Sequence, residues 1–160
     1  MQDDFRRVMA QFVTGVTVMT TRAGEAPHGM TANAVASVSL DPLLVLVCVD
    51  RTTHMARMVR ESGVFALSIL AADQEGLSNR FADRDRPMGA AQFAGVPTAT
   101  GTTGALVLAE SLAWVDCRVW AIHDGGDHEI VVGEVVDLDV GRDVPPLGYF
   151  RSAYVPVGEG

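Results

Sequence analysis

Lysine is absent from this 160-residue chain, so all twelve of its basic residues are arginines. Twenty acidic residues outnumber them, and the formal net charge is −8 with histidine counted as neutral. Because a chain of this sign has no positive field to attract nucleic acid or an anionic membrane, we expect neither as a partner. Any phosphate-bearing ligand has to be held by local arginines and backbone amides.

Cysteine is scarce as well. Cys48 and Cys117 are the only two, and both lie in apolar, strand-like stretches. A buried reduced thiol is more common there than a disulfide or a nucleophile. The start of the chain, MQDDFRRVM, lacks the basic and apolar blocks of a signal peptide, and no apolar run approaches the roughly 20 residues of a membrane span. We therefore expect a cytoplasmic protein.

Several chemical motifs are missing too. The four histidines and two cysteines show no metal-ligand spacing such as CxxC or HExxH, so no metal site is expected. Neither a GxGxxG dinucleotide fingerprint nor a GxSxG nucleophile elbow occurs. A nicotinamide nucleotide, if one binds, would have to lie against another ligand and not in a βαβ domain.

The residues that are present predict one β-rich domain over residues 1–160. The hydrophobic content is 48%, and the length is enough to bury a core. Apolar periodicity predicts short helices at 3–12, 53–62 and 73–81, the last capped by Asp73. β-branched or alternating stretches predict strands in the segments 16–21, 34–40, 43–49, 64–70, 106–108, 111–122 and 128–140. Strands joined by hairpins are consistent with a closed or split antiparallel barrel.

The chain is organised around residues 29–54. The unbroken apolar run 43–49 predicts a strand buried on both faces, which is typical of the centre of a sheet or barrel. Small and polar residues precede this strand, and Asp50-Arg51-Thr52-Thr53-His54 follow it at the start of a helix. Hydroxyls, backbone amides and an arginine at a helix start suit an anion. We therefore expect a planar, phosphate-bearing ligand here.

The same stretch carries a resemblance to a known family. The segment GMTANAVASVSLDPLLVLV is similar to the GxTAN(S)xxSVSLDPPLVLV pattern of the flavin-reductase-like, FMN-binding split-barrel proteins. Gly126-Asp127-His128, followed by Gly133-Glu134-Val135, is a second match. The resemblance extends over residues 5–154. It implies a mainly β fold, a Greek-key split β-barrel with a few short helices, that binds flavin at the interface of a homodimer.

Residue by residue, the resemblance places the isoalloxazine ring along the first motif. The cofactor-binding residues expected there are Met30, Thr31, Ala32, Asn33, Ala34, Ser37, Val38, Ser39, Cys48 and Asp50. Ala34 stands where many relatives carry serine, so one hydroxyl contact is missing or is replaced by a backbone group. The alternative for the polar members of this set is ordinary solvated strand residues.

For the phosphate we expect Arg51, Thr53 and His54, with help from Phe81, Arg84 and Arg86. The alternative for Arg51, Thr53 and His54 is an ordinary capped helix with exposed polar residues. The alternative for Arg84 and Arg86 is a solvated charge cluster.

The second motif supplies the expected catalytic residue, His128. In the resembling reductases the histidine of this element lines the nicotinamide pocket and can donate a hydrogen bond to the cofactor. Gly126 and Asp127 would set its position, and Tyr149 and Arg151 would close the same pocket. The alternative is a solvated turn histidine. His28 and His123 match no motif, and both are expected at the surface.

The expected activity is that of an NAD(P)H-dependent flavin reductase of the two-component type. Hydride would pass from NADH or NADPH to FMN, or to FAD, and the reduced flavin would serve a separate monooxygenase. No side chain has to act as an acid or base, because the protein only stacks the two rings and excludes water. The alternative is a split-barrel protein or oxidase that holds a flavin without nicotinamide-dependent reduction.

Overall fold

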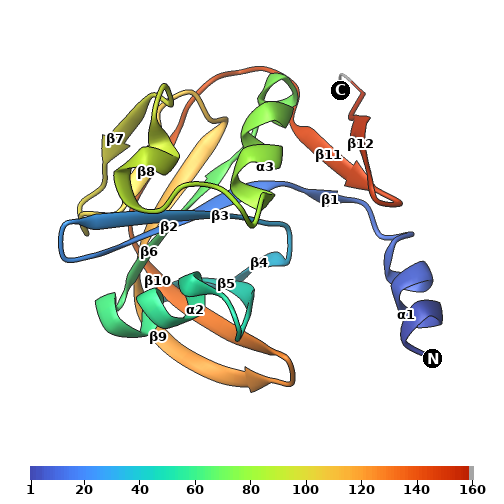
Figure 1. The fold of residues 1–160 in the computed structure, drawn as a ribbon, viewed down its shortest axis with the longest axis horizontal. Coiled ribbons are helices and arrows are strands. Elements are labelled where there is room, and N and C mark those ends of the chain that lie inside the picture. The colour runs from blue at the N-terminus through green and yellow to red at the C-terminus, as the bar shows by residue number, and fades with distance from the viewer. Residues whose placement is uncertain (159–160) are drawn as a thin grey trace.

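The apolar run of the organising stretch forms strand β5 (Leu43–Asp50) of a seven-stranded antiparallel sheet. A computed structural model describes residues 1–158 (Figure 1). The order of strands in the sheet is β3-β2-β6-β9-β10-β5-β4. The other members are β2 (Thr17–Ala23), β3 (Ala26–Ala32), β4 (Val35–Leu40), β6 (Val64–Ile69), β9 (Ala113–Gly125) and β10 (His128–Val140).

The two ends of this sheet are joined by a very short connection, and this closes the sheet into a barrel. Strands β3 and β4 lie at opposite ends of the strand order, yet only Asn33 and Ala34 separate them in the chain. The sheet therefore has to curl until its ends meet. The amide of Cys48 donates to the carbonyl of Ala34 at 2.9 Å, next to the remaining gap. The result is the expected split β-barrel.

Within residues 1–158, two small sheets and three α-helices complete the fold. Strand β1 (Thr14–Gly15) pairs with β11 (Leu147–Phe150), and β11 pairs with β12 (Ala153–Pro156), while β7 (Thr98–Thr100) pairs with β8 (Leu106–Leu108). The helices are α1 (Gln2–Met9), α2 (His54–Ser62) and α3 (Glu75–Ala82), with 3₁₀ turns at η1 (Ala72–Gln74) and η2 (Gly89–Phe93). No helix in residues 1–158 is long and apolar enough to cross a membrane.

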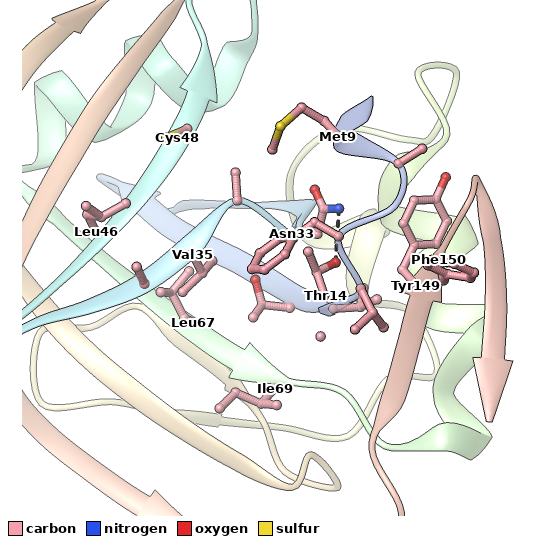
Figure 2. A pocket seen from close by; sticks show the side chains of 18 of the residues that line it. Met9, Thr14, Asn33, Val35, Leu46, Cys48, Leu67, Ile69, Tyr149 and Phe150 are labelled. Carbon is pink, nitrogen blue, oxygen red and sulfur yellow. Dashed lines mark hydrogen bonds between the residues drawn. The ribbon is translucent and has the colours of Figure 1, made fainter. Parts of the chain in front are cut away.

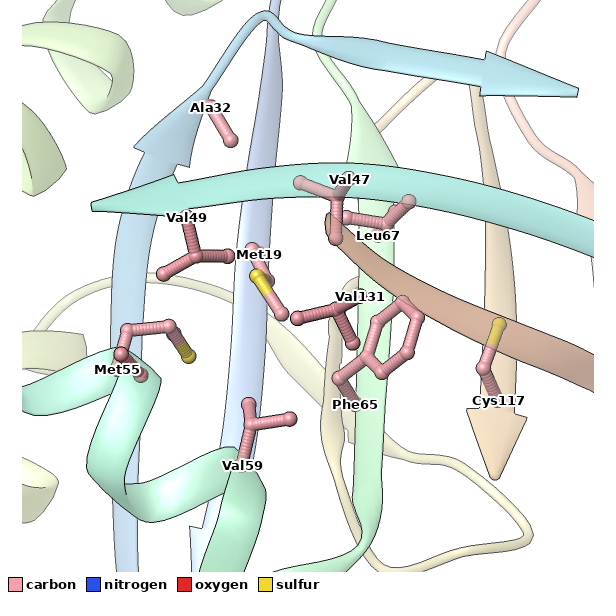
Figure 3. Close-up of a cluster of buried hydrophobic side chains, with 11 residues drawn as sticks. Met19, Ala32, Val47, Val49, Met55, Val59, Phe65, Leu67, Cys117 and Val131 are labelled. Carbon is pink, nitrogen blue, oxygen red and sulfur yellow. The ribbon is translucent and has the colours of Figure 1, made fainter. Parts of the chain in front are cut away.

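The main core lies between the barrel wall and helix α2, as Figure 3 shows. Met55 and Val59 of α2 point toward Met19, Phe65 and Val131 of the strands. Helix α2 agrees with the prediction because its signals are local. The hydroxyl of Thr53 accepts from the Ala56 amide at 3.2 Å, and Gly63 ends the helix with a φ of 69°.

Strand β5 differs from the prediction in one respect that matters for function. Val47 and Val49 are fully buried in the core, but Leu44, Leu46 and Cys48 on the opposite face are only half-buried. Leu46 and Cys48 of that second face line a groove and are not part of the core. A sequence pattern cannot separate the two cases, because both call for apolar residues.

Two helices also differ from the prediction. Helix α3 begins at Glu75, since η1 precedes it and Asp73 pairs with Arg142. Helix α1 ends at Met9, and none of its residues is buried. Its apolar residues Phe5, Val8 and Met9 are 65%, 66% and 48% exposed, so this helix has no core to pack on within its own chain.

Candidate functional site

A groove of about 1080 Å³ runs along the outer face of strand β5 (Figure 2). Its floor includes Leu46 and Cys48 of β5 and the connection from Asn33 to Ser37. Residues of α1, of strands β1, β2, β6 and β9, and of the tail segment 149–152 also line it. Its lining is mostly apolar, so a flat aromatic ligand can be covered there.

Strand β5 extends beyond this apolar groove to Asp50, which lies opposite His128, and we call these two residues the polar end. Cys48 and Asp50 are two residues apart and therefore project to the same side of the strand. Asp50 lies opposite His128 in the register with β10, and Cys48 lies opposite Ile130. The apolar groove and the expected nicotinamide residue thus lie along one continuous strand face, although they are far apart in sequence.

Asp50 is held as an anion at this end. Its carboxylate accepts hydrogen bonds from the amide and the hydroxyl of Thr52, at 2.8 and 2.7 Å. These bonds lower the pKa of Asp50, and the nearby charges of His128 and Arg84 lower it further.

His128 is half-exposed and is oriented by its neighbour. Its Nδ1 lies 2.7 Å from the Asp127 carboxylate oxygen Oδ1, which fixes Nδ1 as the donor. The neutral ring then presents Nε2 as a hydrogen-bond acceptor and donates from it only when protonated. Nε2 is therefore the ring nitrogen through which His128 can contact a ligand.

Arg51 has partners that the sequence pattern did not indicate. Its Nε donates to the Gly126 carbonyl at 2.6 Å, and its Nη2 forms an ion pair with Asp124. Its backbone amide donates to the Asp127 carbonyl at 3.1 Å. The guanidinium is therefore engaged by the turn between β9 and β10, so we do not place it at a flavin phosphate.

Thr53 and His54 lie at the start of helix α2 as expected. The Thr53 hydroxyl is used as the helix cap. His54 is exposed, and its ring centroid lies 6.1 Å from that of His28. The first turn of α2 contains no acidic residue, so its amides and His54 can face an anion.

The expectation of a surface position for His28 is wrong, because its side chain is only 2% exposed. Its Nδ1 lies 3.1 Å from the Gln92 amide nitrogen, and its Nε2 lies 3.3 Å from Nη2 of Arg86. Burial, followed by the charge of Arg86, lowers the pKa of His28 to about 4. His123 is exposed as expected.

Phe81 and Arg86 make contacts within the protein that the sequence pattern did not indicate. Phe81 is fully buried against Phe93, with ring centroids 5.2 Å apart. A Cβ on Gly29 would lie 2.7 Å from the Phe81 ring, so glycine is required for this packing. Arg86 donates to the carbonyl of Gly29 at 2.6 Å and to that of Asp83 at 2.7 Å, and so ties its loop to β3.

The residues of the first motif lie in different environments in the structure. Met30 is half-buried and packs on the core, and Ala32 is buried, so Ala32 can meet a ligand only through its backbone. Thr31 donates its hydroxyl proton to the Ser78 carbonyl of α3 at 2.6 Å. Asn33 and Ala34 line the groove, and Asn33 donates to the Thr14 hydroxyl at 3.2 Å.

The far end of the motif lies away from the polar end. Ser37 still lines the groove, but Ser39 accepts from the Asp41 amide and lies opposite Leu44 in the register. Leu44 is six residues of strand from Asp50, about 20 Å at the rise of a β-strand. Val38 is at the bulge beside Ser39 and is 49% exposed. Neither residue shares the polar end with His128.

Tyr149 and Arg151 of the tail line the groove, whereas the sequence placed them in the nicotinamide pocket with His128, a residue that does not line this groove. Tyr149 packs edge-on against Tyr154. Arg151 donates to the Gln11 side chain at 2.6 Å, which ties the tail to the segment after α1. Sequence reasoning missed the contribution of Phe5, Met9 and Phe12 to the groove lining. The apolar periodicity of α1 was the available signal, but it was interpreted as core packing.

Among residues 1–158 no group of three or more histidine, cysteine or acidic side chains is arranged to hold a metal ion. Cys48 and Cys117 are both free thiols, and Cys117 is buried as expected, whereas Cys48 faces the groove.

Comparison with known proteins gives consistent matches over nearly the whole chain. The family model described as "Flavin reductase like domain" matches residues 9–158. The reductase subunit of a flavin-dependent monooxygenase from Rhodococcus jostii is 37% identical over 153 residues, which cover 96% of this chain and 76% of that protein. An NADH-dependent FAD reductase from Streptomyces globisporus is 44% identical over 132 residues, which cover 82% and 72%.

The fold has equally similar solved structures. The flavin reductase component of a bacterial two-component tryptophan halogenase superposes with a TM-score of 0.93 at 37% identity, and both chains are covered completely. Further relatives carry the name of NADH-dependent FMN reductases. The similarity therefore includes reductases of both flavins.

Proposed function

The chain belongs to the flavin reductase like domain family, and we propose that it reduces free or bound flavin with NADH and supplies the reduced flavin to a separate monooxygenase. The observation that carries this function is the continuity of the apolar groove with the Asp50–His128 end of strands β5 and β10. One face can cover a flat ring, and the adjoining end offers polar groups to a second ligand.

The residues of the groove fit an isoalloxazine ring. Leu46 and Cys48 provide an apolar floor, and Asn33 and Ala34 bring an amide side chain and backbone groups to its edge. The small side chain of Ala34 leaves the backbone accessible. When bound, the flavin supplies the hydride-accepting chemistry, and the protein holds and covers it.

For the phosphate group we propose the start of helix α2, with His54 and Arg84. Helix amides and an arginine compensate a negative charge that the chain's net charge of −8 would otherwise repel. FMN is the flavin we assign, with FAD as the alternative that the relatives also use.

His128 is the residue we place against the nicotinamide. With Nδ1 fixed by Asp127, its Nε2 can accept from the carboxamide nitrogen and hold the ring in one orientation. Orientation and exclusion of water are the contributions that hydride transfer needs from the protein. NADH is the donor we assign, and NADPH is the alternative.

A homodimer is the assembly we propose. The apolar residues of α1 are exposed and line the groove from one side, which leaves a large apolar surface uncovered in one chain. A second copy would cover the helix and the open side of the groove together. We place the protein in the cytoplasm, where its two free thiols stay reduced.

The activity is tested by following NADH oxidation with FMN, FAD or no flavin added, and then with NADPH in place of NADH. The proposal expects oxidation that depends on flavin and is faster with NADH. A protein that binds flavin tightly but oxidises neither nucleotide would be a flavin carrier or an oxidase and would refute the proposal.

A further inference from the structure

We propose that Arg51 is a positioning residue for the nicotinamide side of the reaction: it clamps the turn between β9 and β10 and thereby fixes His128. This inference rests on the proposed function, because His128 is assigned there to the nicotinamide. It gives Arg51 a different role from the phosphate contact that its place at a helix start indicates.

The turn is short and rich in glycine. Gly125 lies opposite His128 in the register, so only Gly126 and Asp127 connect the two strands. Gly126 has a φ of 78°, which fits the first central position of a type II′ turn. Hairpin ends of this kind are exposed and readily displaced when nothing holds them.

Arg51 holds this turn through its backbone and its side chain. Its amide donates to the Asp127 carbonyl, its Nε donates to the Gly126 carbonyl, and its Nη2 pairs with Asp124. Asp124 also accepts from the Gly126 amide at 3.3 Å. Both sides of the turn are therefore tied to the end of β5.

The guanidinium of Arg51 is itself held in place by a buried carboxylate. The Glu129 carboxylate is 5% exposed and lies 3.7 Å from Nη1 of Arg51. The same carboxylate accepts from Nε and Nη2 of Arg60 on helix α2, at 3.0 and 2.5 Å. The guanidinium of Arg51 is thus fixed between a buried carboxylate and the turn, and it has little freedom to reach a ligand on the groove side.

The consequence for catalysis is specific. Without the side chain of Arg51, the turn keeps its two strands but loses the contacts that fix its tip, so His128 and Asp127 sample more positions. A small displacement of an orienting group reduces productive ring placement. The flavin groove is built by other elements and should keep its affinity.

The test compares Arg51→Gln with Arg142→Gln. Arg142 is a matched clamp: it donates to the Glu110 carbonyl at 2.7 Å and pairs with Asp73, and it follows the far end of β10. The side chains of Arg51 and Arg142 are 36% and 33% exposed, respectively. Each substitution removes one positive charge and one hydrogen bond from the side chain to a backbone carbonyl.

We expect Arg51→Gln to raise the KM for NADH about five- to tenfold, with FMN and riboflavin affinities each within about twofold of wild type. Arg142→Gln should leave KM unchanged, although both variants melt at a lower temperature. Arg51→Lys, which keeps the charge near Asp124, should give an intermediate KM, and it preserves the test if Arg51→Gln folds poorly.

Two results would overturn the inference. Arg51→Gln could match Arg142→Gln in KM, or it could weaken FMN but not riboflavin. The first would make Arg51 merely structural, and the second would place it at the phosphate. Failure of the proposed function is distinct, because the wild-type protein would then oxidise no NADH with any flavin.

Discussion

His28 and His128 show at the residue scale how surroundings decide what the same side chain does. His128 is half-exposed, paired with Asp127 and aligned with Asp50 at the end of strand β5. His28 is buried between Gln92 and Arg86. The first can serve a ligand, and the second can only support the fold.

Replacing His128 by alanine should slow flavin reduction while leaving flavin affinity nearly intact. The loss of one neutral hydrogen bond, about 0.5–1.5 kcal/mol, corresponds to a several-fold to tenfold decrease in kcat/KM. Flavin titration by fluorescence quenching and a steady-state series in NADH measure the two quantities. If His128→Ala abolished flavin binding but spared turnover per bound flavin, the two ligands would be placed the wrong way round.

His28 should make stability depend on pH. Its pKa is about 4 in the native state against 6.5 in the unfolded chain, so between these values only the unfolded state takes up the proton. The free energy of unfolding therefore falls as the pH is lowered from 6.5 to 4. From pH 7 to pH 5 the loss attributable to His28 is about 2 kcal/mol.

Urea unfolding of wild type and His28→Gln at pH 7 and pH 5 tests this. The variant should lose about 2 kcal/mol less than wild type between the two values. His123→Gln, at an exposed position, should behave like wild type. Equal losses in wild type and His28→Gln would mean that His28 is protonated as easily in the folded protein as in the unfolded chain.

At the scale of elements, local signals were sufficient for some parts of the fold and not for others. The sequence predicted helix α2 and strands β5, β6 and β10 closely, because caps and apolar runs are local. Strands β11 and β12 were not predicted, since short strands depend on partners elsewhere in the chain. The role of helix α1 was missed for a similar reason: an amphipathic pattern does not say what covers it.

The candidate site was predictable only in part. The two motifs gave His128 and the groove segment, but the partners of Arg51 and His28 come from the β9–β10 turn and from the loop after α3. Tertiary contacts of this kind leave no periodic trace in the sequence. They give Arg51, Phe81 and Arg86 partners within the protein that the sequence did not indicate.

Gly133 illustrates an element-scale constraint that yields a prediction. A Cβ at this position of β10 would lie 2.4 Å from the Phe65 ring in the core. Gly133→Ala should therefore destabilise the protein by about 1–3 kcal/mol through overpacking. Gly76→Ala in α3, where nothing lies within 4 Å of the added carbon, should be neutral or slightly stabilising. Denaturant unfolding compares them, and equal stability of the two variants would contradict the packing argument.

At the scale of the whole molecule, the exposed face of α1 predicts that the chain functions as a pair. Phe5→Glu places a charge on the apolar face of α1 and should shift the protein from dimer to monomer. Arg7→Gln changes the net charge by the same amount on the opposite face and should leave the dimer intact. Light scattering measures the molar mass of each variant in solution. A wild-type protein that is monomeric with and without flavin would contradict the proposed assembly.

The central claim is that this fold brings a nicotinamide nucleotide to a flavin lying in its groove. The most direct measurement is anaerobic stopped-flow mixing of the flavin-loaded protein with NADH and, separately, with NADPH. The account predicts rapid loss of the oxidised flavin absorbance with NADH, at a rate that rises with NADH concentration until the site is saturated. An oxidised flavin spectrum that stays unchanged with both nucleotides would contradict it.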